Sequence, residues 1–120
     1  MFKKSLIAAM VLASVPHLAL AHAHVGTSTP AKDAVVKTTP AAITLTLTEG
    51  LEPAFSSLTL VNAAGDMVAT GKSALAPDDS KTLVLPIGKE LPAGAYTVKW
   101  QALSKDGHKT QGTWSFTVKP

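Results

Sequence analysis

Two short histidine-containing stretches of this sequence carry groups that bind metal ions. His22 and His24 lie near the N-terminal end, and Asp106 and His108 lie near the other end. A histidine that begins a polypeptide can chelate one metal ion through its α-amine and the δ-nitrogen of its own ring. Such an amine, two imidazoles and a carboxylate suit a tetragonal nitrogen and oxygen environment, which favours Cu(II) over other divalent ions. The residue types therefore predict a Cu(II) site formed by His22, Asp106 and His108.

This prediction depends on a cut that makes His22 the first residue. Two lysines at positions 3 and 4 and an apolar stretch over 6–20 form the first two parts of a secretory signal. Ala19 and Ala21 then match the small-residue cleavage pattern, so we expect residues 1–21 to be a signal peptide and 22–120 the mature domain. A cut after Ala23 is the alternative and would expose His24 instead. A membrane anchor is disfavoured, because a spanning helix needs about 20 predominantly apolar residues and the apolar stretch over 6–20 is shorter than that.

Two further residues are weaker candidates for the same site. His24, as third residue of the mature chain, could wrap Cu(II) through deprotonated backbone amides, or could be an ordinary surface histidine. Glu49 follows an alternating segment, and it is either a solvated carboxylate or an acceptor that orients the amine or an imidazole. Met67 is the only methionine after the leader, so no thioether site for Cu(I) is expected.

The composition limits the other function classes. After loss of the leader lysines, nine basic residues face eight acidic ones, and the lysines are scattered along the chain. This balance predicts neither a nucleic-acid partner nor a stable membrane insertion. The absence of cysteine excludes a disulfide framework and thiolate metal ligands. A mature chain of 99 residues suits one exported domain, for which we expect a monomer.

The apolar pattern is that of β-strands. Apolar and polar residues alternate with a period of two, which places the apolar side chains of each strand on one face. The alternating apolar sets are Ile43, Leu45 and Leu47; Tyr96, Val98, Trp100 and Ala102; and Trp114, Phe116 and Val118. Shorter apolar runs occupy 58–61, 67–69 and 83–85, with proline and glycine between them. The pattern predicts an all-β fold, a single Greek-key β-sandwich or barrel of immunoglobulin-like type with about seven strands.

These strands place the C-terminal metal residues in a hairpin. The triplet Asp-Gly-His at 106–108 falls between a strand that ends near Leu103 and one that starts near Gly112. We expect it at one end of the sandwich, between two packed strands. A short strand from Val25 could run along an edge next to this hairpin and bring the mature N-terminus close to it.

The same residues resemble the CopC family of periplasmic copper-binding proteins over essentially the whole mature chain. The matching segments are His-Ala-His-Val at 22–25, Ser-Thr-Pro-Ala at 28–31, Leu-Thr-Glu-Gly at 47–50, Gly-Ala-Tyr-Thr-Val-Lys-Trp at 94–100 and Ser-Lys-Asp-Gly-His-Lys-Thr at 104–110. The resemblance implies a small Greek-key fold and a Cu(II) site at His22, Asp106 and His108, with Glu49 as a less secure addition. Some members also hold Cu(I) in a methionine-rich loop, which this chain lacks.

Three function hypotheses follow. The first is a non-enzymatic Cu(II) carrier or buffer of the periplasm that contributes to copper tolerance or delivers copper to an inner-membrane transporter of the CopD type. The second is a copper-dependent oxidative enzyme, because an N-terminal histidine brace also occurs in enzymes that cleave polysaccharides. The third is a metal-free immunoglobulin-like interaction module, which would make no use of His22 or Asp106.

Overall fold

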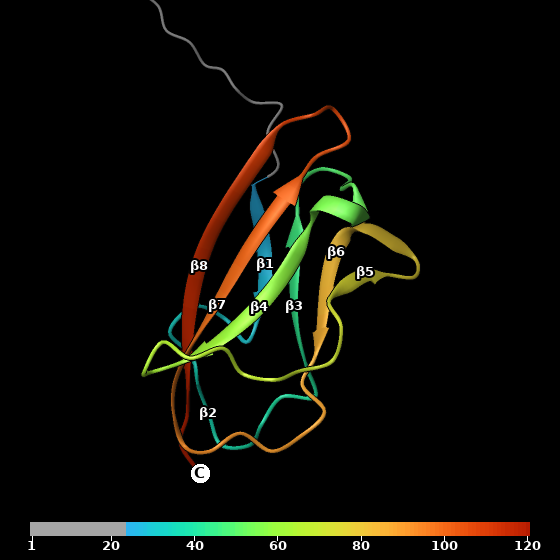
Figure 1. Cartoon of the computed structure of the whole chain (residues 1–120). Helices are drawn as coiled ribbons and strands as arrows, with labels where there is room; N and C mark the ends of the chain where they lie inside the picture. Colours follow the sequence, from blue (N-terminus) through green and yellow to red (C-terminus); the bar gives the residue numbers. More distant parts are fainter. Residues whose placement is uncertain (1–23) are drawn as a thin grey trace, which may run out of the picture.

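The protein is a sandwich of two four-stranded β-sheets, described for residues 24–120 by a computed structural model (Figure 1). The elements are β1 (Val25–Thr29), β2 (Val35–Val36), β3 (Ala42–Leu47), the 3-10 turn η1 (Pro53–Phe55), β4 (Ser57–Asn62), β5 (Ala74–Ala76), β6 (Asp79–Pro86), β7 (Gly94–Leu103) and β8 (Lys109–Val118). One sheet has the order β1-β3-β6-β5 and the other the order β2-β8-β7-β4. The short β2 runs parallel to β8, and the other strand pairs are antiparallel.

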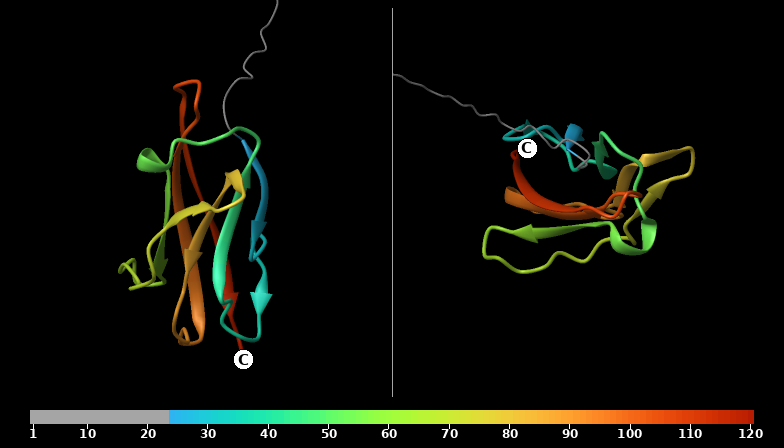
Figure 2. Two further views of the ribbon diagram at one scale, coloured as in Figure 1. Left: turned by 90° about the vertical axis from the view of Figure 1, so that its right-hand side faces the viewer. Right: turned by 90° about the horizontal axis from the view of Figure 1, so that it is seen from above.

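The two sheets face each other across one apolar core, and their layers are seen in profile in Figure 2. The alternation in the sequence accounts for this core, because alternate residues are buried along β3 and over most of β4, β7 and the second half of β8. Tyr96 of β7 and Phe116 of β8 stack with ring centroids 5.8 Å apart. Trp114 donates a hydrogen bond from its indole nitrogen to the Pro30 carbonyl over 2.9 Å, which ties the end of β1 to β8.

The predicted all-β class and most predicted strands are confirmed, with three differences. The described chain has eight strands rather than about seven. The count includes two very short strands, β2 with two residues and β5 with three, which the alternating pattern did not predict. The run at 67–69 is not a strand, since Met67 makes only an isolated bridge to Val61 and is exposed. The last strand starts at Lys109 rather than near Gly112.

The hairpin of β7 and β8 is the element that positions the predicted metal residues. Its ladder runs without interruption from the pair Gly94–Val118 to the pair Leu103–Lys109, so the connecting turn is short and its ends are fixed. Gly112 allows this close pairing, because a Cβ at that position would lie 2.9 Å from the Trp100 ring. The hairpin tip and the start of β1 lie at the same end of the sandwich in Figures 1 and 2, and the C-terminus lies at the other end.

None of the helical structure within residues 24–120 has the length and apolar character needed to cross a membrane.

Candidate metal centre

The turn at 104–108 is closed by backbone hydrogen bonds across the tip of the hairpin. The Ser104 amide donates to the His108 carbonyl over 2.9 Å, and the Gly107 amide donates to the Ser104 carbonyl over 2.9 Å. Gly107 has a φ of 92°, which glycine adopts at little steric cost. The glycine between the two metal candidates is therefore required by the backbone of the turn.

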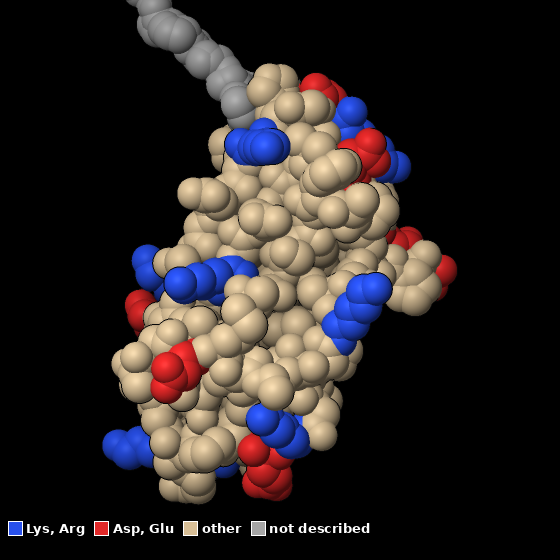
Figure 3. Space-filling view, viewed as in Figure 1, with Lys and Arg blue, Asp and Glu red and all other residues tan. Residues whose placement is uncertain are grey.

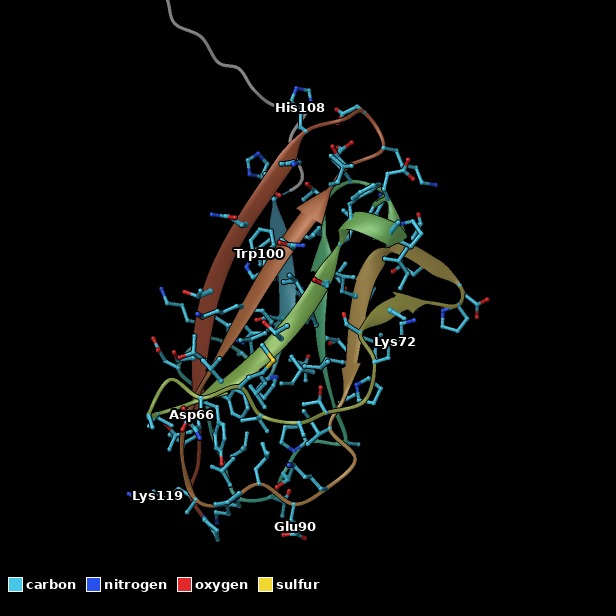
Figure 4. The ribbon with its side chains drawn as sticks, in the orientation of Figure 1. Asp66, Lys72, Glu90, Trp100, His108 and Lys119 are labelled. Carbon is cyan, nitrogen blue, oxygen red and sulfur yellow. The ribbon has the colours of Figure 1, made fainter. Side chains whose placement is uncertain are left out.

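Asp106 and His108 are in direct contact within this turn. His108 Nδ1 lies 3.0 Å from Asp106 Oδ1, and the two side chains are 46% and 39% exposed. An ionised carboxylate only accepts hydrogen bonds, so the proton of a neutral His108 ring is on Nδ1 and the lone pair is on Nε2. This arrangement matches the carboxylate–histidine pairs that orient imidazole ligands in metal sites. Figure 4 shows His108 at the tip of the β7–β8 end of the molecule.

The Asp106 carboxylate is held in its charged form. The hydrogen bond from the Ser104 hydroxyl, followed by the one from the His108 ring, lowers the pKa of Asp106 below its ordinary value of 3.8. Asp106 is therefore an anion throughout the neutral range, which is the form that binds a cation.

The chain enters the domain next to the end of β3. The backbone amide of His24 donates to Thr48 Oγ1 over 3.0 Å, and the Thr48 amide donates to the His24 carbonyl over 2.9 Å. His22 lies outside the described residues, so its position stays a prediction. Chelation through the His24 backbone amide would require loss of the hydrogen bond to Thr48, which disfavours that mode for His24.

The segment that follows β3 also contacts the hairpin. The Lys105 amide donates to the Gly50 carbonyl over 3.0 Å, and Leu51 forms a bridge with Ser104. The half-buried Glu49 lies between Thr48, which holds His24, and Gly50, which holds the hairpin. One short segment thus connects the entry of the chain with the Asp106–His108 turn, although β1 itself pairs with β3 and not with the hairpin.

Within residues 24–120, no group of three or more histidine, cysteine, aspartate or glutamate side chains is arranged to hold a metal ion. Asp106 and His108 are brought together, whereas Glu49 and His24 do not join them in such a group.

Two polar residues of this region were not singled out from the sequence. Ser104 is buried and contacts both Asp106 and His108, and Thr48 holds the His24 backbone. The only signal for Ser104 was a serine at a strand end next to a turn, a position where serine side chains often bond to the backbone. The only signal for Thr48 was its place beside Glu49.

Comparison with known proteins gives consistent matches. The family model described as "CopC domain" matches residues 25–119. Protein YobA of Escherichia coli strain K12 is 39% identical over 99 residues, covering 82% of this chain and 80% of that protein. Copper resistance protein C of Escherichia coli is 32% identical over 123 residues, covering 97% of this chain and 96% of that protein. The crystal structure of CopC from Methylosinus trichosporium OB3b superposes with a TM-score of 0.76 at 32% identity, covering 82% of this chain and 95% of that one.

Proposed function

The chain belongs to the CopC family, and on that premise we propose that its mature form is a periplasmic Cu(II) carrier or buffer. The ligands in this proposal are the α-amine and ring of His22, the Asp106 carboxylate and the His108 imidazole. The observation that carries the proposal is the Asp106–His108 pair, exposed at the same end of the sandwich as the entry of the chain.

The proposal requires His22 to be the first residue and to reach the hairpin. Cleavage of residues 1–21 by a signal peptidase supplies the free amine. His22 is then two residues from His24, whose backbone is anchored at Thr48, and two extended residues span about 7 Å. This length keeps the amine near the end of the sandwich that carries the hairpin.

The donor set favours the oxidised metal. The chain has no cysteine, and Met67 lies next in sequence to Asp66, which Figure 4 shows far from His108. Cu(I) prefers soft sulfur ligands, whereas imidazole, amine and carboxylate suit Cu(II). We infer that reduction by a partner releases the ion, and we propose an inner-membrane copper transporter of the CopD type as the protein to which copper is delivered.

The other parts of the proposal concern residues near the site and the surface. Glu49, between the two anchored segments, is proposed to orient the amine or an imidazole, and His24 to be a surface residue or a secondary ligand. Basic and acidic side chains are interspersed on the face seen in Figure 3. The proposed form is a monomer with no nucleic-acid partner and no stable membrane insertion.

A copper-dependent oxidative enzyme has less support than a carrier. Trp100 and Trp114 are only 9% and 7% exposed, so neither offers an aromatic platform for a sugar ring. Steady peroxide production by the copper protein with an added reductant would support the enzyme instead. A failure to bind copper at all would support the interaction module.

The decisive experiment compares two purified proteins, one beginning with His22 and one with a single alanine added before His22. We expect the first to bind one Cu(II) with a visible absorption band, and the second to bind far more weakly with its fold unchanged. Equal affinity would refute the proposed role of the amine. The intact mass of the protein recovered from the periplasm tests the cleavage after Ala21.

A further inference from the structure

The outer face of the β2-β8-β7-β4 sheet carries a groove that begins at the end of the sandwich with the hairpin tip. It consists of two hollows of about 290 and 630 Å³, and Gln101 of β7 and Gln111 of β8 line both of them. The smaller hollow extends to Phe55 and Lys109, and the larger one to Lys99. Figure 1 shows β8, β7 and β4 in front of β1 and β3, so the groove lies on the side of the sheet turned away from the core.

The strand register explains why these side chains share one face. Gln101 pairs with Gln111 of β8 and with Ser57 of β4. Paired residues of antiparallel strands have their side chains on the same face, and successive residues of one strand alternate between faces. Trp100 is buried, so its neighbours Lys99 and Gln101 point outward. The groove is therefore lined by side chains that the core does not use.

The charged side chains of the groove are all basic. Lys99 and Lys109 line it, and no aspartate or glutamate of residues 24–120 does. Within the same part of the chain, neither lysine forms an ion pair, and the side-chain amides of Gln101 and Gln111 make no hydrogen bond. A negatively charged occupant would thus meet donors that the fold leaves available.

Phe55 makes one end of the groove apolar. It lies in η1, directly before β4, and is 61% exposed although it is aromatic. It lines the smaller hollow together with Lys109. A hollow beside an exposed ring can take one apolar side chain of a partner, which is the usual form of an interface anchor.

The backbone of this face is not available to an occupant. β7 pairs with β4 on one side and with β8 on the other, so its amides and carbonyls are used within the sheet. Strand addition is therefore not the mode of binding here, and recognition depends on the side chains. Two ammonium groups, two amides and a phenyl ring suit a segment that has carboxylates and an apolar side chain.

The groove also adjoins the candidate metal centre. Lys109, which lines its smaller hollow, directly follows His108 in the sequence. A protein segment in the groove would therefore lie against the hairpin tip, where a copper-exchanging partner has to bind.

We propose that this groove is the docking surface for an acidic peptide segment, with carboxylates at Lys99 and Lys109 and an apolar side chain against Phe55. The segment belongs to the protein that exchanges copper with this one. That second statement rests on the proposed Cu(II) function, whereas the docking itself concerns the metal-free protein.

The experiment uses the metal-free protein that begins with His22 and a synthetic hexapeptide of alternating glutamate and leucine. The side-chain amide signals of Gln101 and Gln111 in nitrogen-15 NMR spectra report binding at the groove. We expect the acidic peptide to shift these signals and to bind more weakly as salt is added. A hexapeptide of alternating lysine and leucine should leave them unchanged. Polygalacturonate tests an acidic saccharide as the occupant.

Variants then test each part of the groove. We expect Lys99→Gln and Lys109→Gln each to weaken peptide binding about threefold, the range of an exposed ion pair. Phe55→Ala should weaken it at least as much. Lys119→Gln is the matched charge control, since Figure 4 shows Lys119 at the opposite end from the hairpin tip. Met67→Ala is the matched apolar control, because Met67 is 73% exposed and lies outside the groove.

Three results would contradict the docking role. These are unshifted Gln101 and Gln111 signals at millimolar acidic peptide, equal effects of Lys99→Gln and Lys119→Gln, or tighter binding of polygalacturonate than of the peptide. The first needs no variant. A failure of the unsubstituted protein to bind Cu(II) would instead contradict the proposed function, with the peptide measurement still reporting on the groove.

Discussion

At the scale of single residues, Asp106 combines exposure with two hydrogen bonds that keep it charged. An exposed carboxylate on a turn usually has no fixed hydrogen-bond donors and changes its orientation freely in solvent. Here the Ser104 hydroxyl and the His108 ring both donate to the same oxygen, and both lower the pKa of Asp106. The residue is therefore an oriented anion before any metal binds.

Replacement of Asp106 by asparagine tests this role. Asp106→Asn removes the negative charge and replaces the carboxylate by a neutral amide, which is a weaker hydrogen-bond acceptor and a poor ligand for copper, so we expect Cu(II) affinity to fall by at least about tenfold. The fold should remain, since the side chain is exposed. Asp66→Asn is the matched control, because Asp66 lies far from His108 (Figure 4) and should leave the affinity unchanged. Competition titration against a copper chelator measures both, and equal affinities would contradict the ligand role.

At the scale of elements, the segment after β3 is the link between the entry of the chain and the hairpin. Thr48 bonds to the His24 backbone through its hydroxyl and its amide, and Gly50 accepts the Lys105 amide. Each of these contacts is modest alone, at about 1 kcal/mol for a hydrogen bond. Together they place two segments that are far apart in the sequence at one end of the sandwich.

Thr48→Val tests whether this anchoring matters for copper. Valine keeps the shape of threonine but removes Oγ1, the acceptor of the His24 amide. We expect a several-fold loss of Cu(II) affinity with little change in stability, because the freed terminus samples more conformations before it binds. Thr44→Val, in the preceding strand β3, is the control, since no described contact joins its hydroxyl to the entry of the chain. Equal affinities of the two variants, measured by Cu(II) titration, would show that this anchor is unimportant.

At the scale of the whole molecule, stability depends on pH through carboxylates whose pKa is lowered by folding. Asp79 accepts hydrogen bonds from the Lys81 amide over 2.9 Å and the Thr82 hydroxyl over 2.8 Å, and these lower its pKa below 3.8. Asp106 is shifted in the same direction. The unfolded chain thus binds protons at a higher pH than the folded chain, so stability falls as pH drops.

We therefore expect the copper-free protein to be most stable above the ordinary carboxyl pKa of 3.8 and to lose stability as pH falls below it. Asp79→Asn should lower the melting temperature at neutral pH and reduce its pH dependence in the acid range. Thermal unfolding at several pH values measures this, and Asp66→Asn is the control. A larger effect of Asp79→Asn in acid than at neutral pH would contradict the assignment.

Copper release should occur at a higher pH than this acid unfolding. An imidazolium or an α-ammonium group is a weaker acid than a carboxyl group, so on acidification these ligands take up protons before the carboxylates do. Since these groups must lose their protons to bind Cu(II), affinity should decrease on acidification while the sandwich is still folded.

Much of the fold could be predicted because its physical cause is local. The alternation in β3, β7 and β8 specifies which side chains are buried, and Asp106-Gly107-His108 lies where two such strands must turn. Pro86 ends β6 as its missing amide proton predicts. The run at 67–69 does not form a strand. Its pairing with β4 is limited to one isolated bridge between Met67 and Val61, and the Met67 side chain is exposed rather than packed in the core.

The residue types by themselves determined the all-β class, the hairpin and the chemical nature of the candidate ligands, because periodicity and donor chemistry are properties of each segment. Only the tertiary structure decided that Thr48 anchors His24, that Gly50 holds Lys105, and that Ser104 contacts both Asp106 and His108. The Thr48 and Gly50 contacts join segments far apart in the sequence, and spacing along a chain carries no information on which distant groups meet. The contacts of Ser104 are local, but they depend on the turn conformation that β7 and β8 impose when they pack against the rest of the sandwich.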